Sequence, residues 1–341
     1  MYQSHEWFRV LLKQTNGDGL AVAVIRDNQG AIRGLCPVQL QSTRVGFQIL
    51  GRIRWARLFS AVTILGNAPL WDSSEPELMR LFIRATFQHF RSANAIKMSA
   101  VSPTSEFGRI VYALLPRAGV DYIRGNYHTL PFPPTLVEHQ KRFGPKRRYN
   151  YRREQRLLEA ALGPLVEFHL CSETDVRAGL NRLEAAEKAS VSDAERGFIG
   201  VIRRRLSDSV ELAAAGLCKS MMVCCGDRIV AYVVAYQYGH RVHFHKTEMN
   251  PELIDYSPGS LATYLFGISV YEPDALGRSR PTDVVFGFSF PNITHFPNNI
   301  IEDRSKLIIL RPGIRNSLFR FAFRNLERAK QLLKRIRGAR S

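Results

Sequence analysis

The sequence contains no uninterrupted apolar run of the ~18 or more residues that a transmembrane helix requires. Its beginning, MYQSHEWFRVLLKQ, has neither the long apolar core nor the small-residue cleavage site of a secretory signal. Cysteine is scarce and shows no zinc-type spacing: the five thiols are Cys36, Cys171, Cys218, Cys224 and Cys225. We therefore expect a cytoplasmic protein with reduced, buried thiols and no metal site.

Acidic side chains are also scarce, with 30 Asp and Glu against 48 Lys and Arg, for a formal net charge of +18. The excess is local. Residues 141–156 hold eight basic residues and one acidic residue, and residues 311–341 hold ten and one. We expect anionic partners at these two places. A hydrophobic content of 45% excludes a disordered chain, and 341 residues suffice for two domains.

One order of elements is predicted twice, about 200 residues apart. Residues 19–41 read as a hairpin, followed by a strand at 60–66, a helix within 67–90 and a strand at 95–101. Residues 219–239 again read as a hairpin, followed by a strand at 241–249, a helix at 257–272 and a strand at 282–289. Between them, residues 135–163 form a basic, mostly helical connector interrupted at Gly144-Pro145.

This repeat predicts an α/β fold with mixed sheets. We expect one unit over residues 1–134 and a second over 135–312 that begins with the connector. A basic amphipathic helix should follow over 313–341.

The second predicted helix begins with YSPGS, residues 256–260. A first helical turn leaves N–H groups unpaired and carries partial positive charge, so phosphate is a natural ligand there. Ser257 can cap, Pro258 suits the first helical position and Gly259 permits close backbone approach. The same residues are also typical of a structural helix that binds nothing. Within the repeated frame, we interpret them as a phosphate site.

These elements resemble the acyl-CoA-binding core of the GNAT acyltransferase superfamily, and two such cores resemble the FemAB-like double-GNAT arrangement. GPKRRYNYRREQRLLEA and MNPELIDYSPGSLATYLFGI are similar to segments of CelD-like acetyltransferases of bacterial polysaccharide biosynthesis. The resemblance covers about residues 5 to 310. The family's next strand continues into a glycine–acid pair and a Tyr–Lys pair. Here VVFGFSFPNITHFPNN, within residues 284–299, keeps only Gly287, which puts a role for those residues in doubt.

The resemblance implies roles for named residues. It puts the phosphates of an acetyl-CoA or other acyl-CoA at Ser257, Pro258, Gly259 and Ser260. Glu248, near the end of the third strand, lies where many such enzymes have a base, and Tyr256 is a candidate acid for the leaving thiolate. His245 is an alternative base.

Further histidines and one aspartate are weaker candidates. His295 and Asp283 lie near the divergent strand. His243 and His245 share one face of a strand, with His240 close by, but no carboxylate or cysteine ligand spacing accompanies them. We therefore expect no metal.

The connector arginines allow three interpretations. Arg148, Arg152 and Arg156 share one helical face and could clamp a phosphorylated acceptor, such as a nucleotide- or lipid-linked sugar. A solvated basic helix is the plain alternative. The interleaved Tyr149 and Tyr151 would suit nucleic acid, although no recognised nucleic-acid motif accompanies them.

Taken together, the residues and the resemblance predict an acyl-CoA-dependent N- or O-acyltransferase. The acceptor would be a saccharide or saccharide precursor in cell-envelope or exopolysaccharide biosynthesis, and the group an acetyl or other short acyl. Two alternatives stay open. One is a catalytically silent GNAT-fold module that binds the polysaccharide-synthesis machinery, and the other is an aminoacyl-tRNA-dependent FemAB-like transferase.

The predicted C-terminal helix has a continuous apolar stripe: Ile314, Leu318, Ala322, Leu326, Ala329, Leu333 and Ile336. Phe319, Phe321 and Phe323 widen the apolar surface near its start. The helix either docks this surface on the core with a solvated cationic back, or lies on an anionic membrane and keeps the enzyme at its inner face.

Overall fold

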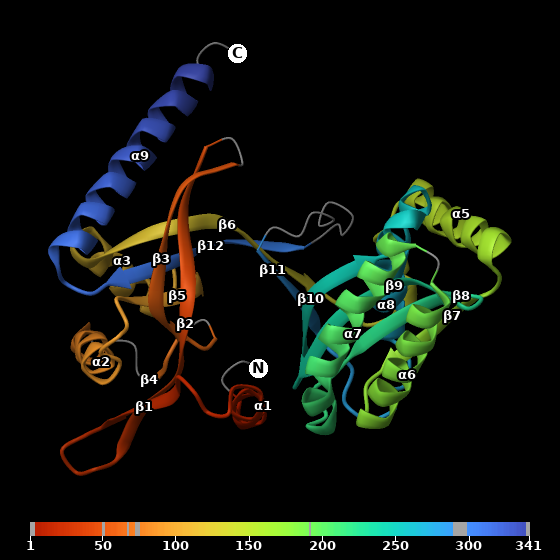
Figure 1. The fold of residues 1–341 in the computed structure, drawn as a ribbon, viewed down its shortest axis with the longest axis horizontal. Helices are drawn as coiled ribbons and strands as arrows, with labels where there is room; N and C mark the ends of the chain where they lie inside the picture. The colour runs from red at the N-terminus through yellow and green to blue at the C-terminus, as the bar shows by residue number, and fades with distance from the viewer. Residues whose placement is uncertain are drawn as a thin grey trace. The chain divides into compact units, whose positions relative to one another are not determined.

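The computed structural model describes residues 4–49, 52–66, 68–71, 76–190, 192–288 and 299–338. The fold is mixed α/β, as the sequence predicts, and divides into two compact units (Figure 1). The first unit comprises Tyr2–Asn126 with Glu302–Ser341, and the second comprises Tyr127–Ile301. The repeat alone suggests a boundary near residue 134 and a second unit reaching 312. In the structure, residues 302–310 belong with the N-terminal half.

The sheet of the first unit has the order β1-β2-β3-β5-β12-β6, with β4 paired to β2. Its strands are β1 (Leu20–Arg26), β2 (Ile32–Ile49), β3 (Arg52–Ile64), β4 (Leu70–Trp71), β5 (Ala95–Val101), β6 (Gly119–Pro131) and β12 (Ile300–Leu310). β3 and β5 run parallel, while β1–β2, β2–β3 and β5–β12 are antiparallel. Both β6 and β12 cross the boundary between the units.

Helices lie on both faces of this sheet. α2 (Pro76–His89) and α3 (Glu106–Ala118) bury Phe82 and Phe107 against one face. α9 (Ile314–Gly338) docks Phe319 and Phe323 on the other face, against Phe59. α1 (His5–Thr15) is capped by Ser4, whose hydroxyl accepts a hydrogen bond from the backbone N–H at position 7.

Phe319 and Phe323 therefore dock α9, whereas Phe321, at 69% exposure, and the aliphatic stripe do not. Ile314 is 82% exposed, Leu318 63% and Leu326 37%. The predicted docking of this helix on the core therefore holds for Phe319 and Phe323, which lie four residues apart on one face, but not for the exposed residues of the stripe.

The second unit has the sheet order β6-β11-β10-β9-β8-β7. Its further strands are β7 (Leu165–Leu170), β8 (Ser220–Cys225), β9 (Arg228–Tyr238), β10 (Arg241–Met249) and β11 (Asp283–Phe288). β10 and β11 are parallel, and the other described pairs are antiparallel. β9 is buried from Ile229 to Gln237 because helices cover both faces, so it reads as one apolar run in the sequence.

α5 (Pro145–Leu162) and α8 (Pro258–Ser269) share the core on one face of this sheet. α6 (Glu173–Ala189) and α7 (Asp193–Ala214) pack together on the opposite face (Figure 1). The predicted break in the connector is confirmed, because α4 (Leu136–Lys141) ends before Gly144 and α5 begins at Pro145. A short 3₁₀ helix, η1 (Pro251–Tyr256), precedes α8.

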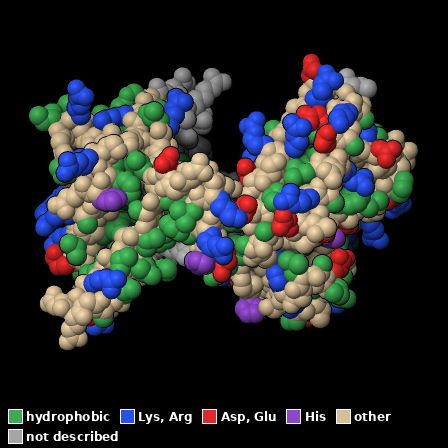
Figure 2. Space-filling model, turned by 60° about the horizontal axis from the view of Figure 1, so that its bottom comes forward, with side chains coloured by type: hydrophobic (Ala, Val, Ile, Leu, Met, Phe, Trp, Pro, Cys, Tyr) green, Lys and Arg blue, Asp and Glu red, His purple; other side chains and the backbone are tan. Residues whose placement is uncertain are grey.

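Two predictions about the whole chain can be checked. All five cysteines are unpaired and buried, as expected. No helix within the described ranges combines the length and the apolar content needed to cross a bilayer. Figure 2 shows basic side chains spread over the visible face of each unit.

Candidate functional site

The parallel strands β10 and β11 stay paired over only three residues, from Arg241 with Asp283 to His243 with Val285. Beyond them β11 continues along β6, while β10 continues along β9 as far as Met249. In the described part of the sheet, the second half of β10 thus has a strand partner on one side only. A strand edge of this kind has the N–H and C=O spacing that suits an extended ligand carrying amide groups.

A bulge interrupts β10 where it leaves β11. Phe244 pairs with Ala235 and Lys246 with Val234, so His245 is the extra residue. Bulges re-aim side chains and are common beside active sites. The His245 ring lies edge-on to Tyr236, with ring centroids 5.4 Å apart. Desolvation, together with the nearby Arg205 cation, lowers the pKa of His245.

Glu248 lies three residues further along β10, with its side chain 17% exposed. Its Oε1 is 3.4 Å from Arg205 Nε on α7 and 2.5 Å from Lys246 Nζ. Thr247, the preceding residue, instead contacts Thr263 on α8, at 3.0 Å between the hydroxyl oxygens. Glu248 and His245 therefore belong to the α7 side of the strand, opposite α8.

The start of α8 is less completely capped than the sequence suggests. Ser257 has a left-handed backbone, with φ 52° and ψ 41°, and its side chain makes no cap hydrogen bond. Its carbonyl oxygen accepts hydrogen bonds from the N–H groups of Ser260 and Leu261. Pro258 occupies the first helical position as predicted. Because Pro258 has no N–H and the Ser260 N–H is bonded to Ser257, the first-turn donor that the missing cap leaves for a ligand is the N–H of Gly259.

Gly259 packs the start of α8 on β10. A Cβ at this position would lie 3.4 Å from Met249 Sδ and 3.6 Å from Thr247 Cγ2, which are ordinary contact distances. The carbonyl oxygen of Gly259 also accepts a hydrogen bond from the Thr263 hydroxyl, at 2.8 Å. A side chain here would point toward the strand, so the local packing gives glycine a structural reason besides close approach to a ligand.

The three predicted arginines lie along α5. Arg152 and Arg156 each donate from Nε to a carbonyl oxygen one turn earlier, and no ion pair formed by the described residues involves Arg148, Arg152 or Arg156. Arg148 and Arg152 both lower the pKa of Tyr264, although desolvation raises it overall. Tyr264 lies four residues after Ser260 and so shares its face of α8. The cations of α5 therefore lie beside α8.

The two connector tyrosines differ. Tyr151 is buried and stacks on Tyr264, with ring centroids 4.1 Å apart, and burial raises its pKa to about 12. Tyr149 is 56% exposed. Tyr151 is a core residue, so the pair of interleaved tyrosines proposed for nucleic acid is reduced to one.

The remaining candidates are dispersed. Tyr256 ends η1 and packs against the α8-side core. Asp283 is held by Arg241, at 2.6 and 3.0 Å, and His243 has a pKa lowered to about 4, chiefly by desolvation. His295 lies outside the described residues. Across the described ranges, no group of three or more His, Cys, Asp or Glu is arranged to hold a metal ion.

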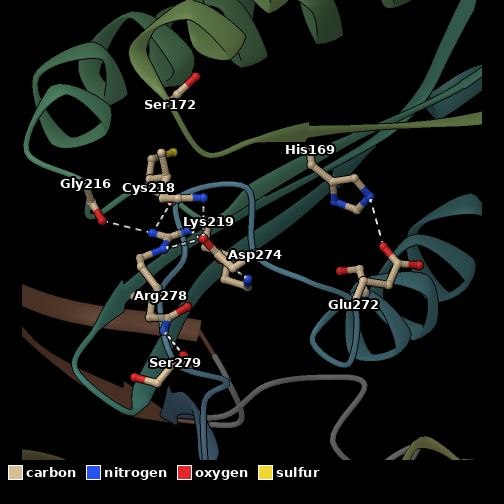
Figure 3. Close-up of polar contacts among 12 residues, drawn as sticks. His169, Ser172, Gly216, Cys218, Lys219, Glu272, Asp274, Arg278 and Ser279 are labelled. Carbon is tan, nitrogen blue, oxygen red and sulfur yellow. Dashed lines mark hydrogen bonds and ion pairs between the residues drawn. The ribbon is translucent and has the colours of Figure 1, made fainter.

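An ion-pair cluster that sequence reasoning missed lies in the same unit (Figure 3). Asp274 accepts hydrogen bonds from Lys219 Nζ at 2.7 Å and from Arg278 Nε and Nη2 at 3.0 and 2.9 Å. Arg278 also donates to the carbonyl oxygens of Gly216 and Cys218. Hydrogen bonds from the two cations hold the pKa of Asp274 far below its usual value, against desolvation, which raises it.

This cluster fastens the loop after α8 to the start of β8. The side chains of Lys219, Asp274 and Arg278 are 9%, 5% and 16% exposed. The residues are up to 59 positions apart, and nothing in their local sequence signals the contact. A cavity of about 100 Å³ lies beside the cluster, and another of about 530 Å³ lies between β7 and α6. None of the site residues predicted from the sequence lines either one.

A match to a protein family defines the class. Residues 145–266, from the start of α5 into α8, match the family model described as an acetyltransferase (GNAT) domain. This segment contains Glu248, His245, the start of α8 and the α5 arginines. The second unit thus carries a GNAT acetyltransferase domain, and the protein is an acyltransferase by class.

Three solved structures are similar to the chain at low sequence identity. A conserved protein of unknown function from Bacteroides thetaiotaomicron VPI-5482 is 12% identical, with 90% of each chain covered and a TM-score of 0.53. A tandem GNAT protein from the clavulanic acid biosynthesis pathway is 12% identical, with 87% and 85% covered and a TM-score of 0.49. FemX is 10% identical, with 95% and 94% covered and a TM-score of 0.47. No curated protein matches the sequence significantly.

Proposed function

We propose that the second unit transfers an acetyl or other short acyl group from acyl-CoA to an amino or hydroxyl group of a saccharide or saccharide precursor. This would place the protein with CelD-like enzymes of cell-envelope or exopolysaccharide biosynthesis, in the bacterial cytoplasm. One observation carries the proposal. After β10 leaves β11 at His243, its second half passes the start of α8 at Thr247 and Met249, and Glu248 and His245 project from the face of the strand opposite α8.

The donor would bind along β10 and at the start of α8. Beyond His243, where the described residues of β11 no longer pair with β10, the strand edge suits the amide groups of pantetheine, which would bond to it as a neighbouring strand does. Its phosphates would meet the start of α8 at Ser257, Pro258, Gly259 and Ser260, where the helix dipole favours negative charge and Gly259 carries a first-turn N–H. This route leads the thioester toward the bulge at His245.

Chemistry would then occur on the α7 side of β10. The acceptor nitrogen or oxygen attacks the thioester carbonyl, and its proton passes to Glu248 or His245. The lowered pKa of His245 keeps its ring neutral, and thus able to accept a proton, to lower pH than an ordinary histidine. The tetrahedral intermediate collapses with loss of the thiolate, which takes a proton from water or from Tyr256, the latter on the α8 side of the strand where the donor would enter. The products are the acylated acceptor and CoA.

The arginines of α5 would bind the acceptor. Arg148, Arg152 and Arg156 span eight residues, or about 12 Å of helix, which matches an extended anion such as a diphosphate-linked sugar better than a single carboxylate. Because they lack carboxylate partners among the described residues, they are available to a phosphate.

Two other functions each have an observation in their favour. Ion pairs with Arg205 and Lys246 would suit a structural Glu248, and therefore a catalytically silent module that binds the polysaccharide-synthesis machinery. Exposed Tyr149 among the arginines would suit the acceptor end of an aminoacyl-tRNA. The second has less support, because Tyr151 is part of the core.

Titration calorimetry with acetyl-CoA, CoA and longer acyl-CoAs tests the donor site. We expect binding at one site per chain, followed by release of CoA thiol when phosphorylated sugars are supplied with the bound donor. Absence of heat with every acyl-CoA would exclude the enzyme. Binding without turnover on any sugar, but with transfer from charged tRNA, would select the tRNA-dependent alternative.

A further inference from the structure

The exposed face of α9 is the strongest surface feature that acyl transfer does not use. Four large apolar side chains point to solvent there: Ile314 at 82%, Phe321 at 69%, Leu318 at 63% and Leu332 at 60% exposure. At 3.6 residues per turn their positions fall within an arc of about 60°. They form one stripe, which we call the outer stripe.

The opposite face of α9 explains why the outer stripe cannot turn inward. Phe319 stacks on Trp55 with ring centroids 5.0 Å apart, and Phe323 packs edge-on to Phe47. Arg324 donates to the carbonyl oxygens of Leu115 and Gly119 at the end of α3. Aromatic packing and these hydrogen bonds fix the rotation of the helix. The outer stripe is therefore a permanent surface of the first unit.

The basic residues of α9 indicate what kind of partner binds the outer stripe. The sequence of α9 contains eight basic residues and one acidic residue, Glu327, which is paired with Lys330. Exposed Arg315 and Arg328 border the outer stripe on its two sides. Long cationic side chains at the edges of an apolar stripe can reach lipid headgroups while the stripe enters the acyl boundary. A second copy would instead bring these cations against one another.

We infer that the outer stripe of α9 binds the surface of an anionic lipid bilayer. The helix lies in the plane of the interface, with Leu318 and Phe321 entering the lipid and Arg315 and Arg328 at the headgroups. At 25 residues, α9 presents about 37 Å to the surface. This inference does not depend on the donor or the acceptor of the acyl-transfer reaction.

The test is co-flotation of the full chain with vesicles of phosphatidylcholine alone or with phosphatidylglycerol added. We expect flotation only with the anionic vesicles and release by salt. Leu318→Ser with Phe321→Ser should weaken binding at least about tenfold, because two large apolar side chains no longer enter the lipid. Leu81→Ser is the matched control. Leu81 is 51% exposed on α2 of the same unit and should not affect flotation.

Each contrary result has a definite meaning. If the full chain stays at the bottom with anionic vesicles, the inference is wrong. Equal flotation of the double variant would also overturn it, because the contact would then be charge alone or lie elsewhere, such as on α5. If the parent chain is a dimer and the double variant a monomer, with no vesicle binding by either, the occupant is a second copy. Since both substituted side chains are exposed, the fold should persist in every arm.

Discussion

The two units share a local frame but differ where an anion would bind. In the first, β3 pairs in parallel with β5 at 61–63, and α2 begins thirteen residues after Thr63. In the second, β10 pairs in parallel with β11 at 241–243, and α8 begins fifteen residues after His243. Both helices have proline at the first position, Pro76 and Pro258. The shared frame therefore supplies a helix start shortly after the first strand of a parallel pair in each.

The residues at the two helix starts differ in how well they would accept a phosphate. The sequence before Pro76 is WDSSE, and Glu77 follows it, whereas Pro258 lies within YSPGS. Acidic residues stabilise a helix N-terminus but repel phosphate from it. Five residues beyond the paired segment, the second unit has Glu248 and the first has Ala68. The frame alone does not make a donor site. Uncharged residues at the helix start and a carboxylate on the strand distinguish the second unit.

The largest effect expected is on stability and should be confined to the second unit. Asp274→Ala leaves Lys219 and Arg278 as buried cations without their carboxylate, at a cost of about 3–5 kcal/mol. All three tryptophans, Trp7, Trp55 and Trp71, lie in the first unit, so their fluorescence reports on it alone. Denaturation should show an earlier transition by circular dichroism and an unchanged one by fluorescence.

Asp193→Ala is the control for that experiment. Asp193 forms an ion pair with Arg196, but its side chain is 97% exposed, so removing it should leave both transitions in place. If Asp274→Ala moves the fluorescence transition as far as the dichroism transition, the two units unfold together and the comparison between them cannot be extended to stability.

Catalysis gives the next largest effect. Glu248→Gln should slow acyl transfer on the order of 100-fold or more while CoA affinity stays constant, since the strand and the start of α8 are unchanged. Steady-state rates with calorimetry measure both. Glu272→Gln, at a 58% exposed carboxylate of the same unit, should be neutral. An active Glu248→Gln beside an inactive His245→Ala would make His245 the base.

A negative charge added at the start of α8 tests the donor site directly. Ser260→Glu adds an acid in the first turn of α8, which favours the helix but repels phosphate, and should weaken CoA binding about tenfold or more. Ser260→Gln should bind nearly as the parent does. Glu77→Gln, at the start of α2, should change nothing. Equal CoA affinity in the Ser260→Glu variant and the parent chain would move the phosphates away from α8.

Much of the second unit's frame could be predicted, because its signals are local. Period-two alternation marks β10, a continuous apolar run marks β9, and Gly144-Pro145 separates α4 from α5. α6 and α7 were not predicted, although apolar residues of α7 such as Phe198, Ile202 and Leu206 recur at helical spacing. Their starts were nevertheless readable, since Ser172 and Ser192 accept hydrogen bonds from N–H groups three residues later.

Contacts between distant segments could not be predicted. β12 joins the first unit by pairing Leu310 with Ala95, and no local pattern identifies a partner more than 200 residues away. The docking face of α9 was ambiguous for a different reason. Phe319 and Phe323 compete with a longer aliphatic stripe, and only the aromatic side chains of Trp55 and Phe59 on the sheet decide between them. Periodicity shows that a helix has an apolar face, but not which neighbour it meets.

The smallest effect expected near neutral pH is a pH dependence in the second unit. His139 on α4 is fully buried among the rings of Phe132, Phe143 and Tyr271. Desolvation, with a contribution from the Arg142 cation, lowers its pKa from 6.5 to about 4. Its stabilising effect is complete above pH 6.5, where the ring is neutral in both states. As the pH falls toward 4, only the unfolded chain takes up the proton, so stability is lost.

This loss should reach about 0.7 kcal/mol between pH 7 and pH 6 and approach about 1.4 kcal/mol per unit below that, levelling off near pH 4. Urea unfolding followed by circular dichroism would measure it. His139→Leu should reduce the slope without abolishing it, because His243 in the same unit has a pKa lowered in the same direction. The tryptophan transition of the first unit should not follow His139. If the free energy of unfolding of His139→Leu depends on pH as steeply as that of the parent chain, the acid sensitivity has another source. The response to pH would then not distinguish the two units through His139.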